Sequence, residues 1–130
     1  MNRFFKYDNT DPSYIPVNTL NECRDDNIDD IYVNGTTTHV FILPYMIDTL
    51  EEIEITYYNE LKNKFVFTSD SENIKILDNC RTTVISCELT PEQTSQFKAK
   101  WDTWAQVRVT FINNEVVFTR KYKIIVVDTL

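Results

Sequence analysis

The sequence predicts an all-β fold: an antiparallel β-sandwich of seven to eight short strands with one short helix and an extended N-terminal arm. Three observations lead to this prediction. Apolar and polar residues alternate with a period of two in several segments after residue 31, which is typical of half-buried strands. Turn residues separate these segments at short intervals, as in sandwich folds. With 130 residues and 42% hydrophobic content, the chain is large enough for one domain with a modest core.

Residues 1–30 form the predicted arm. This segment is rich in Asn, Asp, Thr and Pro, and neither a period of two nor one of 3.6 runs through it. It cannot bury enough surface to fold alone, yet it has too many aromatic residues for an inert linker. We therefore expect the arm to dock on this domain or on a neighbouring subunit, the alternative being a floppy tail. The residues expected to contact a partner are Phe4, Phe5, Tyr7, Tyr14 and Ile15.

Residues 31–130 form the predicted sandwich domain. Its first clear strand covers residues 37–43 and ends at Pro44, because proline cannot continue a strand ladder. The following strands are expected at residues 51–58, 65–67, 73–77, 81–89, 104–112, 115–119 and 122–127. Alternation assigns one face of three strands, namely Ile53, Ile55 and Tyr57, then Thr83, Ile85, Cys87 and Leu89, then Val107, Val109 and Phe111. The last strand is apolar on both faces.

Two local signals predict the helix and the final hairpin. Thr90 can cap a helix, Pro91 suits the first helical position, and Gln93 completes a capping box. The helix is not expected to extend beyond Trp101. Asn113-Asn114 tolerates positive φ and predicts a tight turn between two strands.

One segment resembles the opening of a calcium-binding loop. Residues 25–29 read Asp-Asp-Asn-Ile-Asp, but Asp30 and Thr36 stand where such a loop needs Gly and a bidentate Glu. A solvated acidic turn without a metal is therefore expected.

No catalytic constellation is recognisable in the sequence. His39 is the sole histidine and lies among apolar strand residues, so we expect it to be packed or exposed at an edge. There is no Gly-rich phosphate loop, nucleophile elbow or zinc motif. The sequence predicts neither an enzyme nor a cofactor.

The net charge and the cysteines indicate which partners and which cellular compartment to expect. The net charge of -7 disfavours nucleic acid as a partner, because that affinity comes largely from Lys and Arg. Cys23, Cys80 and Cys87 are odd in number and lack metal-ligand spacing, so we expect buried thiols and folding in a reducing cytoplasm. Neither a signal peptide nor a run of membrane-spanning length is recognisable, which predicts a soluble intracellular product.

The two tryptophans require separate interpretations. We expect Trp104 in the core, where the helix meets the sheet. Trp101 is a candidate interface residue, and an exposed aromatic ring there would also suit sugar stacking.

Residues 35–44 read GTTTHVFILP. They resemble the "GTT-P-x-x-x-F-x-L-P" opening of small phage and prophage proteins, although Thr38 stands where that family has proline. Residues 50–57 loosely match an "I-x-x-x-x-I-x-Y" strand, and residues 78–80, DNC, match a "D-C" turn. Residues 89–97, LTPEQTSQF, fit an "L-T-x-E-x-T-x-x-F" helix, and residues 106–111, QVRVTF, fit a "Q-x-R-V-x-F" strand. Residues 1–34 have no counterpart in this pattern.

Domains of this kind look like the immunoglobulin-like sandwich at the N-terminus of phage baseplate upper proteins. The resemblance implies a virion structural protein of a tailed bacteriophage, in the tail or baseplate or as a capsid or neck accessory. Its expected partners are other virion proteins or further copies in a homo-oligomer or symmetric assembly, with neither nucleic acid nor membrane. It would be assembled in the host bacterial cytoplasm and carried in the virion. The alternatives are a host-surface carbohydrate-binding module and, more weakly, an enzyme or inhibitor of host defence.

Overall fold

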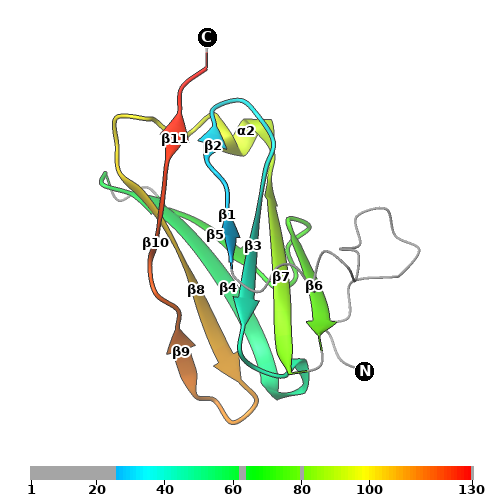
Figure 1. The fold of residues 1–130 in the computed structure, drawn as a ribbon. Coiled ribbons are helices and arrows are strands. Elements are labelled where there is room, and N and C mark those ends of the chain that lie inside the picture. The colour runs from blue at the N-terminus through cyan, green and yellow to red at the C-terminus, as the bar shows by residue number, and fades with distance from the viewer. Residues whose placement is uncertain (1–25, 62–63, 80, 130) are drawn as a thin grey trace, which may run out of the picture.

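The computed structural model describes residues 26–61, 64–79 and 81–129, which form a β-sandwich of two antiparallel sheets and a separate two-stranded parallel sheet (Figure 1). The first sheet has the order β1-β3-β7-β6, formed by Asn27–Ile28, Thr37–Leu43, Thr82–Leu89 and Ile74–Asn79. The second has the order β10-β8-β4-β5, formed by Tyr122–Ile124, Thr103–Phe111, Leu50–Asn59 and Lys64–Thr68, and β9 (Val116–Phe118) also pairs with β8. This strand order corresponds to the A-B-E-D and G-F-C sheets of immunoglobulin domains, with one added strand beside C. The predicted immunoglobulin-like all-β sandwich is confirmed.

The described residues form eleven strands rather than the predicted seven to eight. Two of the additional strands, β1 and β2 (Ile31–Tyr32), have two residues each, too few to show a period. The predicted strand over residues 122–127 is divided at Ile125 into β10 and β11 (Val126–Val127). Strand β10 pairs with β8, whereas β11 pairs in parallel with β2. At the division the backbone N–H of Ile31 donates to the carbonyl of Ile125 at 2.8 Å.

The sheet begins within the segment that the sequence assigned to the arm. Asn27 and Ile28 pair with Val40 and His39 of β3, so residues from Asn27 onward belong to the sandwich. The boundary predicted at residue 31 is therefore too late by a few residues. Residues 1–25 lie outside the described part of the chain, and the arm remains a prediction for them.

The core lies between the two sheets and follows the predicted alternation. Strands β4 and β8 pair antiparallel in the centre of their sheet, with Ile53 opposite Val109 and Ile55 opposite Val107. All four of these side chains are buried, as are Thr83, Ile85, Cys87 and Leu89 on β7. Phe111, the last residue of the predicted inward row on β8, is only partly buried and packs against the edge of the core.

The predicted helix and the predicted tight turn both occur in the links between strands. Helix α2 (Pro91–Thr94) is a single turn with a complete capping box between Thr90 and Gln93, as predicted. Asn114 has φ of 71° in the turn between β8 and β9, which confirms that hairpin. A 3-10 turn, η1 (Ile47–Thr49), links β3 to β4. Within the described part of the chain, no helix is long and apolar enough to cross a membrane.

Candidate functional site

The arm residues proposed as partner contacts cannot be placed. Phe4, Phe5, Tyr7, Tyr14 and Ile15 all lie outside the described residues. Trp101 lies between α2 and β8, where it is half-buried and the Lys100 Nζ stands 5.2 Å from the centroid of its ring. The surfaces that could bind a partner are therefore described for the sandwich domain alone.

Trp104 is not in the core, contrary to the sequence prediction. It is half-buried on the solvent side of β8, and its ring stacks on that of Tyr58 with centroids 5.5 Å apart. The reason is strand parity, since Ala105, Val107 and Val109 point inward and the even-numbered residues must point outward. The size of the indole suggested the core, but the alternation of β8 places it on the other face.

Trp104 belongs to a partly apolar surface, which we call the outer face. It is the solvent side of the sheet formed by β5, β4, β8 and β9. Because Phe118 pairs with Arg108 and Val116 with Thr110, both apolar side chains lie on this side, with exposed fractions of 57% and 43%. The apolar residues of the outer face are Tyr58, Val66, Trp104, Val116 and Phe118. Glu52 and Arg108 lie beside them with a side-chain separation of 3.9 Å.

The outer face combines three aromatic side chains and an arginine with polar and charged neighbours. Aromatic residues and arginine are enriched at the centres of protein interfaces, and Trp, Tyr and Arg dominate their binding energy. Strand β9 also lies at a sheet edge, where unpaired backbone groups can accept a further strand. The sequence signal for this surface was the apolar run Val116-Val117-Phe118 in a strand that must have one solvent face.

Asp26 is a structural residue and not part of a solvated acidic turn. Its Oδ1 accepts the backbone N–H of Ile42 at 2.7 Å, and its Oδ2 accepts the Tyr122 hydroxyl at 2.7 Å. The Arg120 guanidinium lies 3.9 Å from the same Oδ2. Since Ile42 and Tyr122 belong to different sheets, the carboxylate joins the two layers. Among the described residues no group of His, Cys, Asp and Glu could hold a metal ion.

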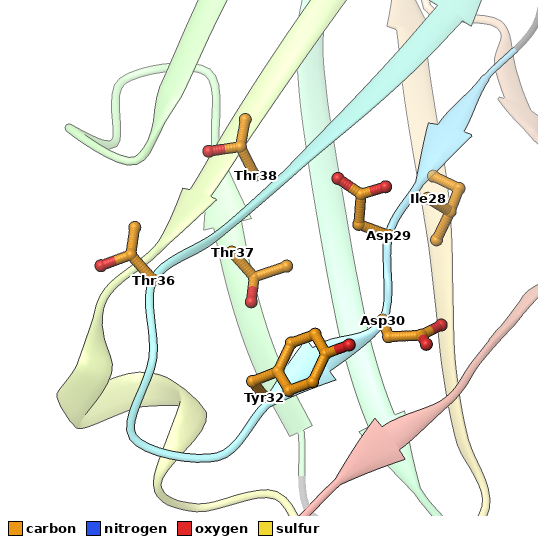
Figure 2. A pocket seen from close by; sticks show the side chains of 7 residues that line it. All are labelled: Ile28, Asp29, Asp30, Tyr32, Thr36, Thr37 and Thr38. Atoms are coloured by element: carbon orange, nitrogen blue, oxygen red, sulfur yellow. The ribbon is translucent and has the colours of Figure 1, made fainter.

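After Ile28 the chain leaves the first sheet and enters β2, which pairs with β11, and this crossover borders a hollow of about 450 Å³ (Figure 2). We call it the crossover hollow. Figure 2 shows the Asp29 and Asp30 carboxylates on the link between β1 and β2, with the Tyr32 ring beyond them and Thr36–Thr38 on the opposite segment. Carboxylates, hydroxyls and an exposed aromatic ring can together hydrogen-bond and stack on a hydroxyl-rich ligand.

His39 is buried in the core, within a polar network that the sequence did not reveal. Its Nε2 is 2.8 Å from the carbonyl oxygen of Asp29, and its Nδ1 is 2.8 Å from the Tyr57 hydroxyl. A carbonyl oxygen can only accept, so Nε2 carries the proton and the hydroxyl donates to Nδ1. Burial lowers the pKa of His39, while the hydrogen bond to the Asp29 carbonyl and the Asp29 charge partly oppose this shift.

The thiol of Cys87 lies buried in the core beside this network. Burial raises the pKa of Cys87 to about 12, and the Tyr57 hydroxyl next to it lowers that value only in part. A thiol with such a pKa stays protonated near neutral pH and is a poor nucleophile. Cys87 is a free, buried cysteine, as predicted, whereas Cys23 and Cys80 lie outside the described residues.

The buried histidine predicts a specific pH dependence of stability. Because its pKa is lower in the folded than in the unfolded chain, where it is 6.5, the unfolded state binds the extra proton. The contribution of neutral His39 to the free energy of unfolding should be fully present above about pH 6.5. Below that pH the free energy of unfolding should fall by up to about 1.4 kcal/mol per pH unit, until the pKa of His39 in the folded state is reached. Urea unfolding between pH 5 and 7 measures this slope, since most carboxylates titrate below about pH 5. His39→Gln keeps a donor and an acceptor but should abolish the slope, and an unchanged slope would contradict the assignment.

No protein-family model and no curated protein matches this chain. Its candidate function therefore rests on the surfaces described above and on the sequence motifs.

Proposed function

We propose that this chain is a structural protein of a tailed-phage virion and acts by protein–protein assembly. The observation that carries the proposal is the outer face, because a sheet with a stacked Trp–Tyr pair and an exposed Phe at its edge suits a protein partner. The motifs shared with small phage and prophage proteins support the virion setting. Partners would be other virion proteins or further copies of this chain, at the tail or baseplate or at the capsid or neck.

The proposal predicts that Phe118→Ser removes the chain from its assembly without unfolding it. Phe118 is exposed, so its loss should change the free energy of unfolding by less than about 0.5 kcal/mol. If the ring is an interface anchor, truncation should weaken binding by about 2 kcal/mol or more, roughly thirtyfold. The measurement is the amount of variant chain incorporated into purified virions when it replaces the wild type.

Ile125→Ser is the matched control for this experiment. Ile125 is 64% exposed and lies between β10 and β11, outside the four strands that form the outer face. It should be incorporated at the wild-type level. Equal incorporation of both variants and the wild type would show that the outer face makes no assembly contact.

A host-surface carbohydrate-binding module is the second candidate, and the crossover hollow is the observation that favours it. Its Tyr32 ring and the neighbouring carboxylates form a more suitable sugar site than Trp101, where the Lys100 ammonium already stands over the ring. This function predicts saturable binding to isolated cell-wall glycan that Tyr32→Ala abolishes. Retention of binding in Tyr32→Ala and its loss in Trp101→Ala would instead place the site at Trp101.

A further inference from the structure

An apolar hollow of about 540 Å³ lies at one end of the sandwich, between the β3–β4 link and the β8–β9 turn. We call it the end hollow. Tyr45 and Met46 line one side, and Phe111, Ile112 and Glu115 line the other. Figure 1 shows both links at the same end of the domain, and the Ile112 N–H donates to the Thr49 carbonyl across them at 3.0 Å.

The walls of the end hollow are held in place by contacts below its surface. The Tyr45 and Phe111 rings meet edge to face with centroids 4.9 Å apart, and the Tyr45 carbonyl accepts the Thr83 hydroxyl at 2.8 Å. Above them Met46 and Ile112 remain 49% and 63% exposed. A preformed apolar hollow of this volume is in the size range of binding pockets and would gain stability from covering these two side chains.

The described part of the chain begins at this end of the domain. Asn27 pairs with Val40 and Ile28 with His39, so β1 is antiparallel to β3. The chain therefore enters β1 from the end at which β3 stops, and Pro44, which lines the end hollow, follows directly there. Residues 1–25 precede this entry point and lie outside the described residues.

The first residues of the arm match the end hollow in chemistry. Residues 3–7 read Arg-Phe-Phe-Lys-Tyr, three aromatic side chains interspersed with two positively charged ones and no acidic residue. The end hollow is apolar, with Glu115 in its lining and the exposed Asp48 in the adjoining turn. In an extended segment Phe5 and Tyr7 point to the same side, so both can face one surface.

We propose that the end hollow binds residues 4–7 of the arm of a neighbouring copy. About 19 residues separate Tyr7 from Asp26, and at about 3.3 Å per residue they span up to about 60 Å. A domain of about 100 residues has a radius of gyration of only about 13 Å, so the arm is long enough to reach another copy. The inference rests on the proposed assembly function and specifies one contact within it.

Complementation between two full-length variants tests the exchange. One variant, Phe5→Ser with Tyr7→Ser, has an altered arm and an intact hollow, and the other, Ile112→Glu, has an intact arm and a charged hollow. We expect the wild type to self-associate with concentration, and each variant alone to have a dissociation constant raised at least tenfold. Because one competent arm and one competent hollow remain in the mixture, light scattering should then detect a 1:1 complex of twice the 15.4 kDa chain mass.

Controls make the outcomes decisive. Ile125→Glu adds the same charge at a side chain of equal exposure and should self-associate like the wild type. Met46→Ser is a second hollow variant that should behave like Ile112→Glu if the hollow is the docking site.

A monomeric wild type at all concentrations, or a mixture that stays monomeric, would overturn arm exchange between copies. If virions still contain the chain in that case, the arm inference fails while the proposed function stands.

Discussion

Replacing Tyr57 with alanine is expected to lower the free energy of unfolding by about 3–5 kcal/mol. Tyr57 is fully buried and its ring meets those of Phe67 and Phe97 edge to face, at 5.9 and 6.3 Å between centroids. Alanine would leave a large cavity between the sheets and would also leave the Nδ1 of His39 without its donor. Because domains of this size are stable by only about 5–15 kcal/mol, this loss is a large share of the total.

Two related variants separate the contributions of ring and hydroxyl. Tyr57→Phe retains the ring and loses only the hydrogen bond to His39, so we expect a loss of about 1–3 kcal/mol. Tyr58→Ala changes the adjacent residue on the outer face, half-buried against Trp104, and should cost only about 1 kcal/mol. Urea unfolding followed by tryptophan fluorescence measures all three. A loss below about 1 kcal/mol for Tyr57→Ala would contradict the described core.

Asp26→Ala is expected to cost about 2–3 kcal/mol. The substitution removes the acceptor of both the Ile42 N–H and the Tyr122 hydroxyl, and hydrogen bonds to charged groups contribute about 1.5–3 kcal/mol each. The two losses should not add fully, because both groups depend on the same carboxylate. Burial, followed by the nearby Asp26 carboxylate, raises the pKa of Tyr122 to about 12, so its hydroxyl remains a donor across the ordinary pH range.

A double-mutant cycle isolates this connection between the sheets. Asp26→Ala, Tyr122→Phe and the double variant should give a coupling energy of at least about 0.5 kcal/mol. Asp70→Ala, at an exposed turn, serves as the control and should lie within about 0.5 kcal/mol of the wild type. Strict additivity of the two substitutions would mean that the carboxylate and the hydroxyl do not stabilise each other.

The regular part of the fold could be predicted because its signals are local. Strand β3 has the bounds that Pro44 and the alternation of residues 37–43 indicate. Inward residues such as Ile55 and Val107 were identified by parity, and the helix start by its capping box. These features depend on neighbouring residues in the sequence, which is why no tertiary information was needed.

The remaining features depend on contacts between distant segments. The two-residue strands β1 and β2 exist only because β3 and β11 lie beside them, and Asp26 is structural only because Tyr122 approaches it. The polar network of His39 likewise requires Tyr57 from the other sheet. Trp104 is different, since its outward position followed from parity and was obscured by the expectation that a large aromatic residue is buried.

Mass spectrometry of purified virions tests the central claim most directly. Virions of the proposed source phage should be purified, and the copy number of the chain measured against the major capsid protein. The account predicts that the chain is present at a fixed stoichiometry related to virion symmetry, and the number itself distinguishes a capsid from a tail position. Absence from virions, with the chain abundant in infected cells, would contradict a structural role and redirect the search to targets in the host.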